Sequence, residues 1–337
     1  MTSTLREQDI RPEALMRDKQ AAVDADRAFL LERRDQWTAV PCPACDENDP
    51  LPFGEKNGFA YDRCARCAAV YTNPRPTESL LAQFYAQSEN YRLWNEILFP
   101  ATEDARRERI FAPRAERLSA ILRSAGVTRN AAIDVGAAFG TFAAQLRDRA
   151  GFRRVVALEP TPALAQTCRD RGFETIESPL ESLTASPEFD LVTAFEVIEH
   201  VHSPRRFIEA CRAMLTPAGA LALSCPSAAG VETRLLGVHA SCFDHEHLNY
   251  FTPESLAALV RRCGLEIIEV QTPGQLDVDL LARAAREGRL RLENEPFLRR
   301  ILLDAADADR LDFQRFLADR LLSSHLWLVA RLPENAG

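Results

Sequence analysis

The chain has 337 residues, 46% of them hydrophobic, which is enough for one large domain with a substantial core and a smaller domain beside it. Its net charge of −8 argues against a general affinity for nucleic-acid phosphates, which depends on lysine and arginine. No apolar run approaches the roughly 20 residues that cross a bilayer, and the N-terminus lacks the apolar core of a signal peptide. We therefore expect a cytoplasmic protein with no nucleic-acid or membrane partner.

The residue composition of the first third of the chain changes twice, and with it the expected secondary structure. Residues 13–37 are rich in alanine and long side chains and lack Gly and Pro, so they are predicted to be helical. Residues 40–73 hold paired cysteines and several Gly and Pro residues, a pattern typical of short strands and turns. Residues 77–122 are predicted to be mostly helical again, with breaks near Pro100 and Pro113.

From Ala131 onward, strands and helices alternate. Each of three predicted helices begins with Ser-Pro or Thr-Pro, which supplies an N-cap and a proline at the first helical position. Strands that alternate with helices of this length indicate a parallel sheet with helices on both faces. The strands are predicted at 131–136, 154–160, 189–197, 219–226, 265–273 and 324–332, and the helices at 141–150, 161–172, 203–215, 252–264 and within 276–322.

Four of the nine cysteines form two CxxC pairs, Cys42–Cys45 and Cys64–Cys67, separated by 18 residues. This spacing predicts a structural zinc site with four thiolate ligands and no open position for catalysis. A redox dithiol or buried thiols are the alternatives. An odd number of cysteines in a chain without a secretory signal argues against a disulfide scaffold. The other five are expected to be packing residues: Cys168, Cys211, Cys225, Cys242 and Cys263.

A strand, a glycine loop, a helix, a second strand and an acid follow one another after residue 130. Asp134 ends the first strand, Gly136 and Gly140 follow it, and Glu159 ends the second strand. Small residues let the backbone approach a ligand at a helix N-terminus, and an acid at this place binds ribose hydroxyls in doubly wound folds. The spacing is not the GxGxxG of nicotinamide enzymes.

The segments "IDVGAAFG", "ALEP", "FDLVTAFEVIEHV", "LTPAGALALSCP" and "SHLWLVARL" resemble class I S-adenosylmethionine (SAM) methyltransferases over about residues 131–332. The resemblance implies an α/β fold with a Rossmann-like sheet of seven strands, the last of them antiparallel. It also implies SAM as cofactor, and by position it places the SAM-binding residues at Asp134, Gly136, Ala137, Phe139, Gly140, Glu159, Pro160, Leu180, Phe195 and Glu196.

The N-terminal stretch from "CPAC" to "QSENY" resembles the zinc-binding module of bacterial methyltransferases that include sugar C-methyltransferases. "DHEHLNYF" resembles the "HEHLxYF" loop of those enzymes, which implies active-site roles for Glu246, His247 and His200. Asp244 stands where that loop usually has a tyrosine. The expected organisation is a helical segment 1–39, a zinc-binding module 40–75, a helical linker or cap 76–126 and a SAM domain 127–337 with a helical insertion at 276–322.

Methyl transfer requires a group that removes a proton from the acceptor. His247, paired with Glu246 or Asp244, is the expected base. For a carbon acceptor beside a ketone, His200 or His245 could stabilise the oxyanion. His245 and His247 stand two apart and could alternatively bind a metal ion with Asp244 or Glu246, or the loop could be purely structural.

Three functions remain open from the sequence. The first is SAM-dependent methylation of a small molecule, expected to be a sugar, a sugar nucleotide or a natural-product precursor. The second is methylation of a protein, an RNA or a phenol, with the zinc module used for recognition. The third is a non-catalytic scaffold with a SAM-type fold, against which the intact Gly136, Gly140 and Glu159 argue.

Overall fold

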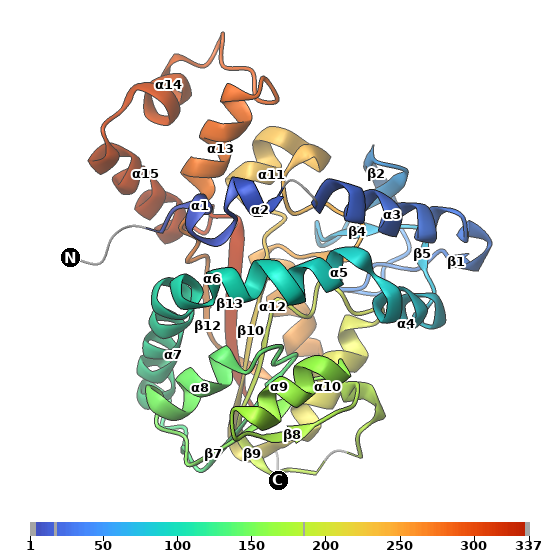
Figure 1. Cartoon of the computed structure of the whole chain (residues 1–337), viewed down its shortest axis with the longest axis vertical. Helices are drawn as coiled ribbons and strands as arrows, with labels where there is room; N and C mark the ends of the chain where they lie inside the picture. Colours follow the sequence, from blue (N-terminus) through green and yellow to red (C-terminus); the bar gives the residue numbers. More distant parts are fainter. Residues whose placement is uncertain (1–4, 17–18, 185, 334–337) are drawn as a thin grey trace. The chain divides into compact units, whose positions relative to one another are not determined.

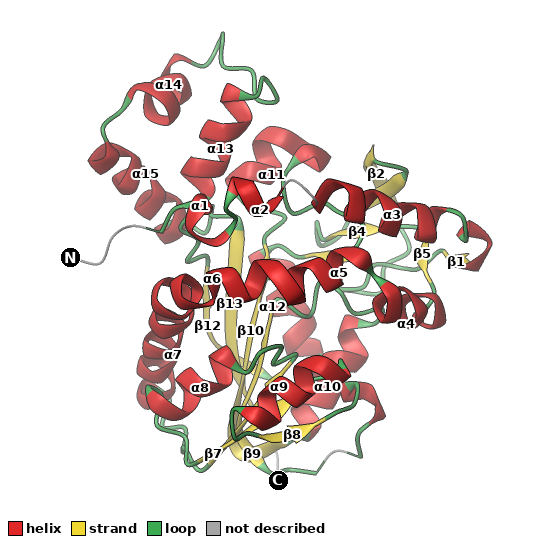
Figure 2. Cartoon of the chain, in the orientation of Figure 1, coloured by secondary structure: helices red, strands yellow, loops and turns green. Residues whose placement is uncertain are grey.

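A computed structural model describes residues 5–16, 19–184 and 186–333 of the chain. Their contacts divide into two compact units, and each unit is described by itself. Unit 1 takes residues from Met1–Leu98, Pro226–Ser255 and Gln271–Leu326, and unit 2 from Phe99–Cys225, Leu256–Val270 and Trp327–Gly337. Figures 1 and 2 trace the elements along the chain. Among the described residues, none of the helices combines the length and apolarity needed to span a bilayer.

A seven-stranded sheet forms the centre of unit 2, with strand order β12-β13-β10-β9-β6-β7-β8 (Figure 2). Parallel pairing joins β10 to β9, β9 to β6, β6 to β7 and β7 to β8. The sheet is mixed, with an antiparallel last strand, and the predicted fold class is confirmed. The strands are β6 (Ala131–Val135), β7 (Arg154–Leu158), β8 (Glu174–Ile176), β9 (Phe189–Phe195), β10 (Leu215–Pro226), β12 (Glu266–Gln271) and β13 (His325–Arg331).

The predicted breaks near Pro100 and Pro113 take the form of widened turns within helical structure. A π-helical turn, Trp94–Leu98, ends two residues before Pro100, and a second, Arg107–Phe111, ends two residues before Pro113. Each proline is the second residue of the α-helix that follows, where its missing N–H costs little. The helices of unit 2 are α6 (Phe99–Arg106), α7 (Ala112–Ser124), α8 (Thr141–Asp148), α9 (Pro162–Asp170), α10 (Pro204–Ala213) and α12 (Pro253–Arg262).

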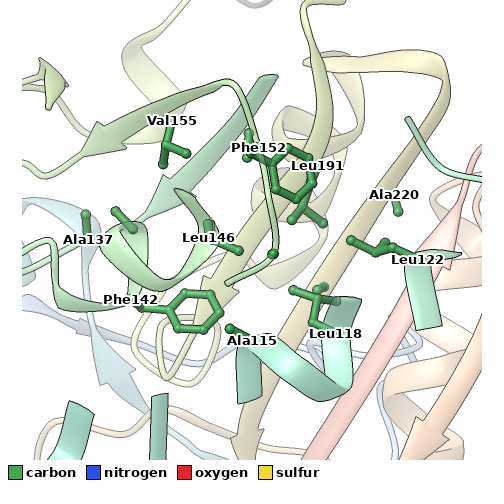
Figure 3. Close-up of a cluster of buried hydrophobic side chains, with 14 of the residues drawn as sticks. Ala115, Leu118, Leu122, Ala137, Phe142, Leu146, Phe152, Val155, Leu191 and Ala220 are labelled. Carbon is green, nitrogen blue, oxygen red and sulfur yellow. The ribbon is translucent and has the colours of Figure 1, made fainter. Parts of the chain in front are cut away.

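The core of unit 2 lies where α7 and α8 pack against the sheet. Figure 3 shows Phe142 and Leu146 of α8 beside Ala115 and Leu118 of α7. Apolar residues recur on α7 and α8 at helical spacing, so one face of each helix is buried. This packing holds the start of α8, and with it the loop after β6, in a fixed position.

Unit 1 contains a four-stranded antiparallel sheet of order β11-β4-β3-β2 and the short pair β1–β5. Its strands are β1 (Trp37–Thr38), β2 (Pro50–Lys56), β3 (Phe59–Cys64), β4 (Val70–Thr72), β5 (Arg75–Pro76) and β11 (Asn249–Tyr250). β11 was not predicted from the sequence, because two residues are too few to show a strand pattern. Asn249 pairs with Tyr71 and Tyr250 with Val70, so the histidine loop is joined to the cysteine-rich segment.

The helices of unit 1 come from three separate stretches of the chain. The helix predicted over 13–37 is interrupted: α3 ends at Leu31 and a 3-10 turn, Arg34–Gln36, leads into β1. The predicted helical segment 276–322 is present as α13, α14, a π-helical turn (Arg300–Asp304) and α15. The α-helices are α1 (Glu7–Ile10), α2 (Glu13–Met16), α3 (Lys19–Leu31), α4 (Glu78–Gln87), α5 (Glu89–Leu93), α11 (Val231–Leu236), α13 (Asp277–Arg286), α14 (Pro296–Arg299) and α15 (Asp307–Asp319).

Candidate active site and thiolate cluster

Two glycines shape the loop that follows β6 in unit 2. Gly136 has a φ of +72°, and a Cβ atom there would lie 2.7 Å from Cγ2 of Val197. Gly140 has a φ of +69° and is the N-cap of α8. Other residue types are strained at such angles, and at Gly136 Val197 also leaves no room for a side chain. The loop therefore exposes the bare backbone that the sequence analysis expected at a nucleotide cradle.

Glu159 follows β7 and turns its carboxylate toward this loop. Oε2 accepts a hydrogen bond from the backbone N–H of Ala138 at 2.9 Å, and Oε1 accepts one from the N–H of Thr161 at 2.9 Å. Burial raises the pKa of Glu159, and these hydrogen bonds oppose that rise. The carboxylate is thus held beside the glycine loop at the carboxyl end of the sheet, where ribose-binding acids lie in doubly wound folds.

Asp134 contacts a neighbouring strand. Its Oδ1 accepts a hydrogen bond of 2.6 Å from the Thr193 hydroxyl, which links β6 to β9. Burial raises the pKa of Asp134 to about 7, and the Thr193 hydrogen bond opposes the rise. Asp134 therefore helps to fix the strand from which the loop departs, and its expected place among the SAM-binding residues stays a prediction.

The remaining predicted cofactor residues differ in their surroundings. The Phe139 ring stacks on Phe99 with centroids 4.3 Å apart, and Phe195 packs between Phe142 and Trp327. Ala137 and Leu180 are buried, whereas Pro160 is exposed. Phe195 is therefore largely a core side chain, so its backbone is the part best suited to line a ligand.

Glu196 stands directly after β9 with a φ of +58°, an unusual conformation for a residue with a side chain. Its Oε1 accepts a hydrogen bond of 2.6 Å from the Ser224 hydroxyl and lies 3.6 Å from Nη2 of Arg114. Strained residues of this kind often mark functional sites. The ion pair between Arg114 and Glu196 was not predicted, since no local sequence pattern connects the two residues.

A second ion pair missed by the sequence analysis lies at the start of α8. Oε1 of Glu103 accepts a hydrogen bond from the Thr141 hydroxyl at 2.7 Å, and Oε2 accepts one from Nη2 of Arg171 at 2.9 Å. The Arg171 guanidinium holds the pKa of Glu103 below its ordinary value. Glu103 and Arg171 are 68 residues apart in the sequence, which explains why no motif revealed them.

The four paired cysteines come together in unit 1. The sulfur atoms of Cys42 and Cys67 are 3.5 Å apart, as are those of Cys45 and Cys64, and all four lie within 4.8 Å of one another. Four sulfurs bonded to one tetrahedral zinc ion at about 2.3 Å would be about 3.8 Å apart. The cluster therefore fits the zinc module that the sequence predicts.

The loop over residues 240–250 is held by donors from the cysteine-rich segment. Lys56 Nζ donates hydrogen bonds to the carbonyls of Ala240 and Phe243, at 3.1 and 2.7 Å. The Tyr61 hydroxyl donates to the Asp244 carbonyl at 3.1 Å. The remaining contacts are from Thr72 Oγ1 to the His247 carbonyl at 3.2 Å, and from Arg75 to the Leu248 carbonyl and Asn249 Oδ1 at 3.2 and 3.0 Å.

His247 has its ring oriented by a backbone carbonyl. Nδ1 lies 2.8 Å from the carbonyl oxygen of Cys242. A carbonyl only accepts, so Nδ1 carries the proton, and in a neutral ring the basic lone pair is on Nε2. Asp244 Oδ2 lies 3.8 Å from Nδ1, and Oδ1 accepts the backbone N–H groups of Glu246 and His247 at 2.9 Å each.

Of the two carboxylates expected as partners of His247, Asp244 is the one that lies beside its ring. The Glu246 carboxylate accepts a hydrogen bond from Asn90 Nδ2 and lies 3.6 Å from Nε2 of His245. Burial raises the pKa of Glu246, and the charge of Asp244 raises it further. His245 and Glu246 therefore belong to a second, buried group of side chains.

His200 lies in unit 2, in a turn after β9 where its N–H donates to the carbonyl of Val197 at 3.0 Å. Its side chain is partly buried. His200 therefore follows β9 directly in the chain, and its role in the chemistry stays a prediction.

Comparisons with known proteins agree with this geometry. Residues 104–270 match a family described as "Methyltransferase domain". The ubiquinone biosynthesis O-methyltransferase of Xanthomonas axonopodis pv. citri (strain 306) is 31% identical over 173 residues, which cover 47% of this chain and 70% of that protein. The chain is a class I SAM-dependent methyltransferase.

Another sequence relative and a solved structure resemble this chain at lower sequence identity. The ubiquinone biosynthesis O-methyltransferase of Xylella fastidiosa (strain M23) is 26% identical over 169 residues, covering 46% of this chain and 68% of that protein. A solved complex of the Haloferax volcanii Trm112 methyltransferase activator with a methyltransferase matches at 17% identity and a TM-score of 0.47, covering 71% of this chain and 97% of that one.

Proposed function

We propose that this methyltransferase transfers a methyl group from SAM to a small-molecule acceptor of the sugar or sugar-nucleotide class, with His247 as the general base. The observation that carries the role of His247 is the hydrogen bond from Nδ1 to the Cys242 carbonyl. It fixes the tautomer, so that Nε2 is the nitrogen that can take a proton.

The cradle in unit 2 has the parts that SAM requires. The backbone of Gly136 and Gly140 would face the methionine portion, Glu159 the ribose hydroxyls, and the Leu180 segment the adenine. When bound, SAM supplies a methyl group on a sulfonium centre. The positive φ angles of the two glycines and the buried acid beside them support this assignment.

The acceptor must lose a proton as it gains the methyl group. Histidine as a residue type is suited to accept that proton, because its imidazole can both take up and release a proton under physiological conditions. The Asp244 carboxylate, 3.8 Å from Nδ1, would stabilise the imidazolium that results. Asp244 is itself fixed by two backbone N–H groups, so it can serve this purpose without rearrangement.

The names of the curated relatives support a small-molecule acceptor, since they describe O-methylation in ubiquinone biosynthesis. The sugar class rests on the "HEHLNYF" loop, which resembles that of sugar C-methyltransferases. The same relatives make a phenolic hydroxyl the second candidate acceptor. The net charge of −8 disfavours RNA.

For the thiolate cluster, we propose a structural zinc ion held by Cys42, Cys45, Cys64 and Cys67. Four sulfur ligands leave no position for a substrate or a water molecule. Because β3 ends at Cys64 and β4 pairs with β11, the ion would stabilise the strands that hold the histidine loop.

The test of the base is His247→Asn, in which the amide nitrogen can replace Nδ1 as donor to the Cys242 carbonyl. Turnover should fall about 10²- to 10⁴-fold while SAM affinity, measured by calorimetry, changes little. The exposed His239→Asn is the matched control. Wild-type turnover in His247→Asn and His247→Ala would refute the proposal.

The acceptor class is tested separately with the wild-type enzyme, using sugar nucleotides in one panel and phenols in another. Mass spectrometry of the products should show methylation in the sugar panel. Methylation confined to phenols would overturn the sugar class and leave the role of His247 intact.

A further inference from the structure

His245 is a buried imidazole between two carboxylates in unit 1. Its side chain is 2% exposed, and Nε2 lies 3.6 Å from Oδ2 of Asp26 and 3.6 Å from Oε1 of Glu246. These distances are longer than hydrogen bonds. The side chains of Asp26 and Glu246 are themselves 4% and 12% exposed. The nitrogen and the two oxygens therefore lie close together in the interior of unit 1.

Neither ring nitrogen of His245 has a hydrogen-bond partner. Buried polar atoms normally have one, and leaving one unsatisfied destabilises the folded state. The ring is oriented by packing, since Phe84 meets it edge to face with centroids 5.8 Å apart. An unsatisfied nitrogen aimed between two carboxylates indicates that something occupies this space.

The two carboxylates are already fixed by other donors. Asp26 accepts hydrogen bonds from the Ser88 hydroxyl and from the backbone N–H groups of Glu89 and Asn90. Glu246 accepts one from Asn90 Nδ2. Burial opposes ionisation of Asp26, but the neighbouring His245 and these hydrogen bonds lower its pKa below the ordinary value. Metal-binding carboxylates are typically oriented by such outer hydrogen bonds, which hold the ligand atoms in place before the ion arrives.

We propose that Asp26, His245 and Glu246 bind a divalent transition-metal ion, separate from the ion of the thiolate cluster. Zinc bonds to nitrogen and oxygen at about 2.0–2.2 Å, so neighbouring ligand atoms of a tetrahedral ion lie about 3.3–3.6 Å apart. The two distances from Nε2 are both 3.6 Å, and all three ligand atoms lie within 4.8 Å of one another. One imidazole with two carboxylates suits zinc and similar metals, and the fourth position would belong to another ligand.

The charge of the cluster favours a divalent ion. Two carboxylates and a neutral imidazole sum to −2 when both acids are ionised, and burying that charge unpaired is costly. Lys19 is a basic residue whose charge interacts with Glu246, and its own pKa is lowered by burial and then by Arg11. A divalent ion would offset the negative charge more fully.

The experiment measures metal per chain after loading the protein with Zn²⁺ and removing unbound ions by gel filtration. We expect about two ions per wild-type chain and about one in His245→Gln and Asp26→Asn, because each loses a ligand of the second site. The matched controls, His239→Gln and the α3 neighbour Asp24→Asn, should keep both; the Asp24 side chain is 58% exposed.

Cobalt substitution keeps the result interpretable if a variant folds poorly. Thiolate-to-cobalt absorption reports the cysteine site, and its presence in His245→Gln shows that this module is folded. The second equivalent of Co²⁺ should add weaker absorption without a thiolate band in wild type and controls, and none in the two variants. One ion per wild-type chain, or two ions in His245→Gln, would overturn the proposal of a second metal site.

Discussion

At the scale of single residues, Glu159 combines two functions in one carboxylate. It fixes the glycine loop through Ala138 and is the group expected to meet the ribose of SAM. A buried acid of this kind is valuable because charge-assisted hydrogen bonds are stronger than neutral ones. Its separation from the loop glycines made it predictable, whereas its hydrogen bonds to backbone atoms have no signature in the sequence.

Replacing Glu159 should weaken SAM binding. We expect Glu159→Ala to raise the dissociation constant at least tenfold, about 1.4 kcal/mol or more, by removing the acceptor for the ribose hydroxyls. Glu159→Gln keeps one oxygen acceptor for the loop, so its dissociation constant for SAM should lie between those of the wild type and Glu159→Ala. Calorimetry with SAM measures both, and Glu177→Ala on the same unit is the control. Unchanged affinity in Glu159→Ala would disprove the ribose contact.

Asp134 should make folding depend on pH. Its pKa of about 7 lies above the ordinary 3.8, so the folded state binds more protons than the unfolded state between these values. This group alone therefore makes stability fall as pH rises from about 4 to 7, by as much as about 1.4 kcal/mol per pH unit. Asp134→Asn should flatten that slope in denaturant unfolding at pH 5 and pH 8. The exposed Asp148→Asn should leave it as in wild type.

At the scale of elements, the decisive feature is the pairing of β11 with β4. It ties the histidine loop to the cysteine-rich sheet, and side-chain donors from β2, β3 and β4 reinforce it. The sequence predicted both segments and their chemistry separately. It could not predict that the two segments pair, because a two-residue strand has no periodicity. The hydrogen bonds to the loop carbonyls also leave no signal, since every residue type has a backbone carbonyl.

Lys56→Met should loosen the loop. The change removes two hydrogen bonds from a half-buried ammonium group to the carbonyls of Ala240 and Phe243, each worth about 1.5–3 kcal/mol as a charged bond. Amide hydrogen exchange over residues 241–248 should become faster, and turnover should fall more than SAM affinity. Glu55→Gln, at an exposed neighbouring position of β2, serves as control. Unaltered exchange in Lys56→Met would mean that strand pairing alone positions the loop.

At the scale of the whole molecule, the chain joins a SAM-type unit to a second unit assembled from three distant stretches. The glycine loop of unit 2 and all its strands except the three-residue β8 follow from local patterns, so they could be predicted from the sequence, whereas the order of the strands in the sheet could not. Unit 1 depends on contacts between residues far apart in the chain, such as Asp26 with Asn90 and Tyr61 with Asp244. No local signal announces such contacts, which is why the sequence left open whether Glu246 or Asp244 pairs with His247.

Loss of the proposed thiolate-bound ion should lower turnover much more than it lowers SAM binding. Cys42→Ser should remove one metal ion per chain and lower turnover strongly, because the strands that hold the histidine loop lose their support. SAM binding should persist, since the cradle residues all belong to unit 2. Metal analysis and calorimetry on one preparation measure both, with the buried Cys211→Ser as control. Full turnover in zinc-free Cys42→Ser would contradict this dependence.

The hydrogen bond from Lys56 to the Phe243 carbonyl also has a consequence for folding during synthesis of the chain. These residues are 187 positions apart. At synthesis rates of about 5–20 residues per second, the N-terminal module waits roughly 10–40 seconds for the loop that completes its sheet. During that time β4 is an unpaired strand edge, the kind of surface that invites aggregation. If the nascent chain binds its metal ion early, β2, β3 and β4 would already be folded while β11 is still being synthesised.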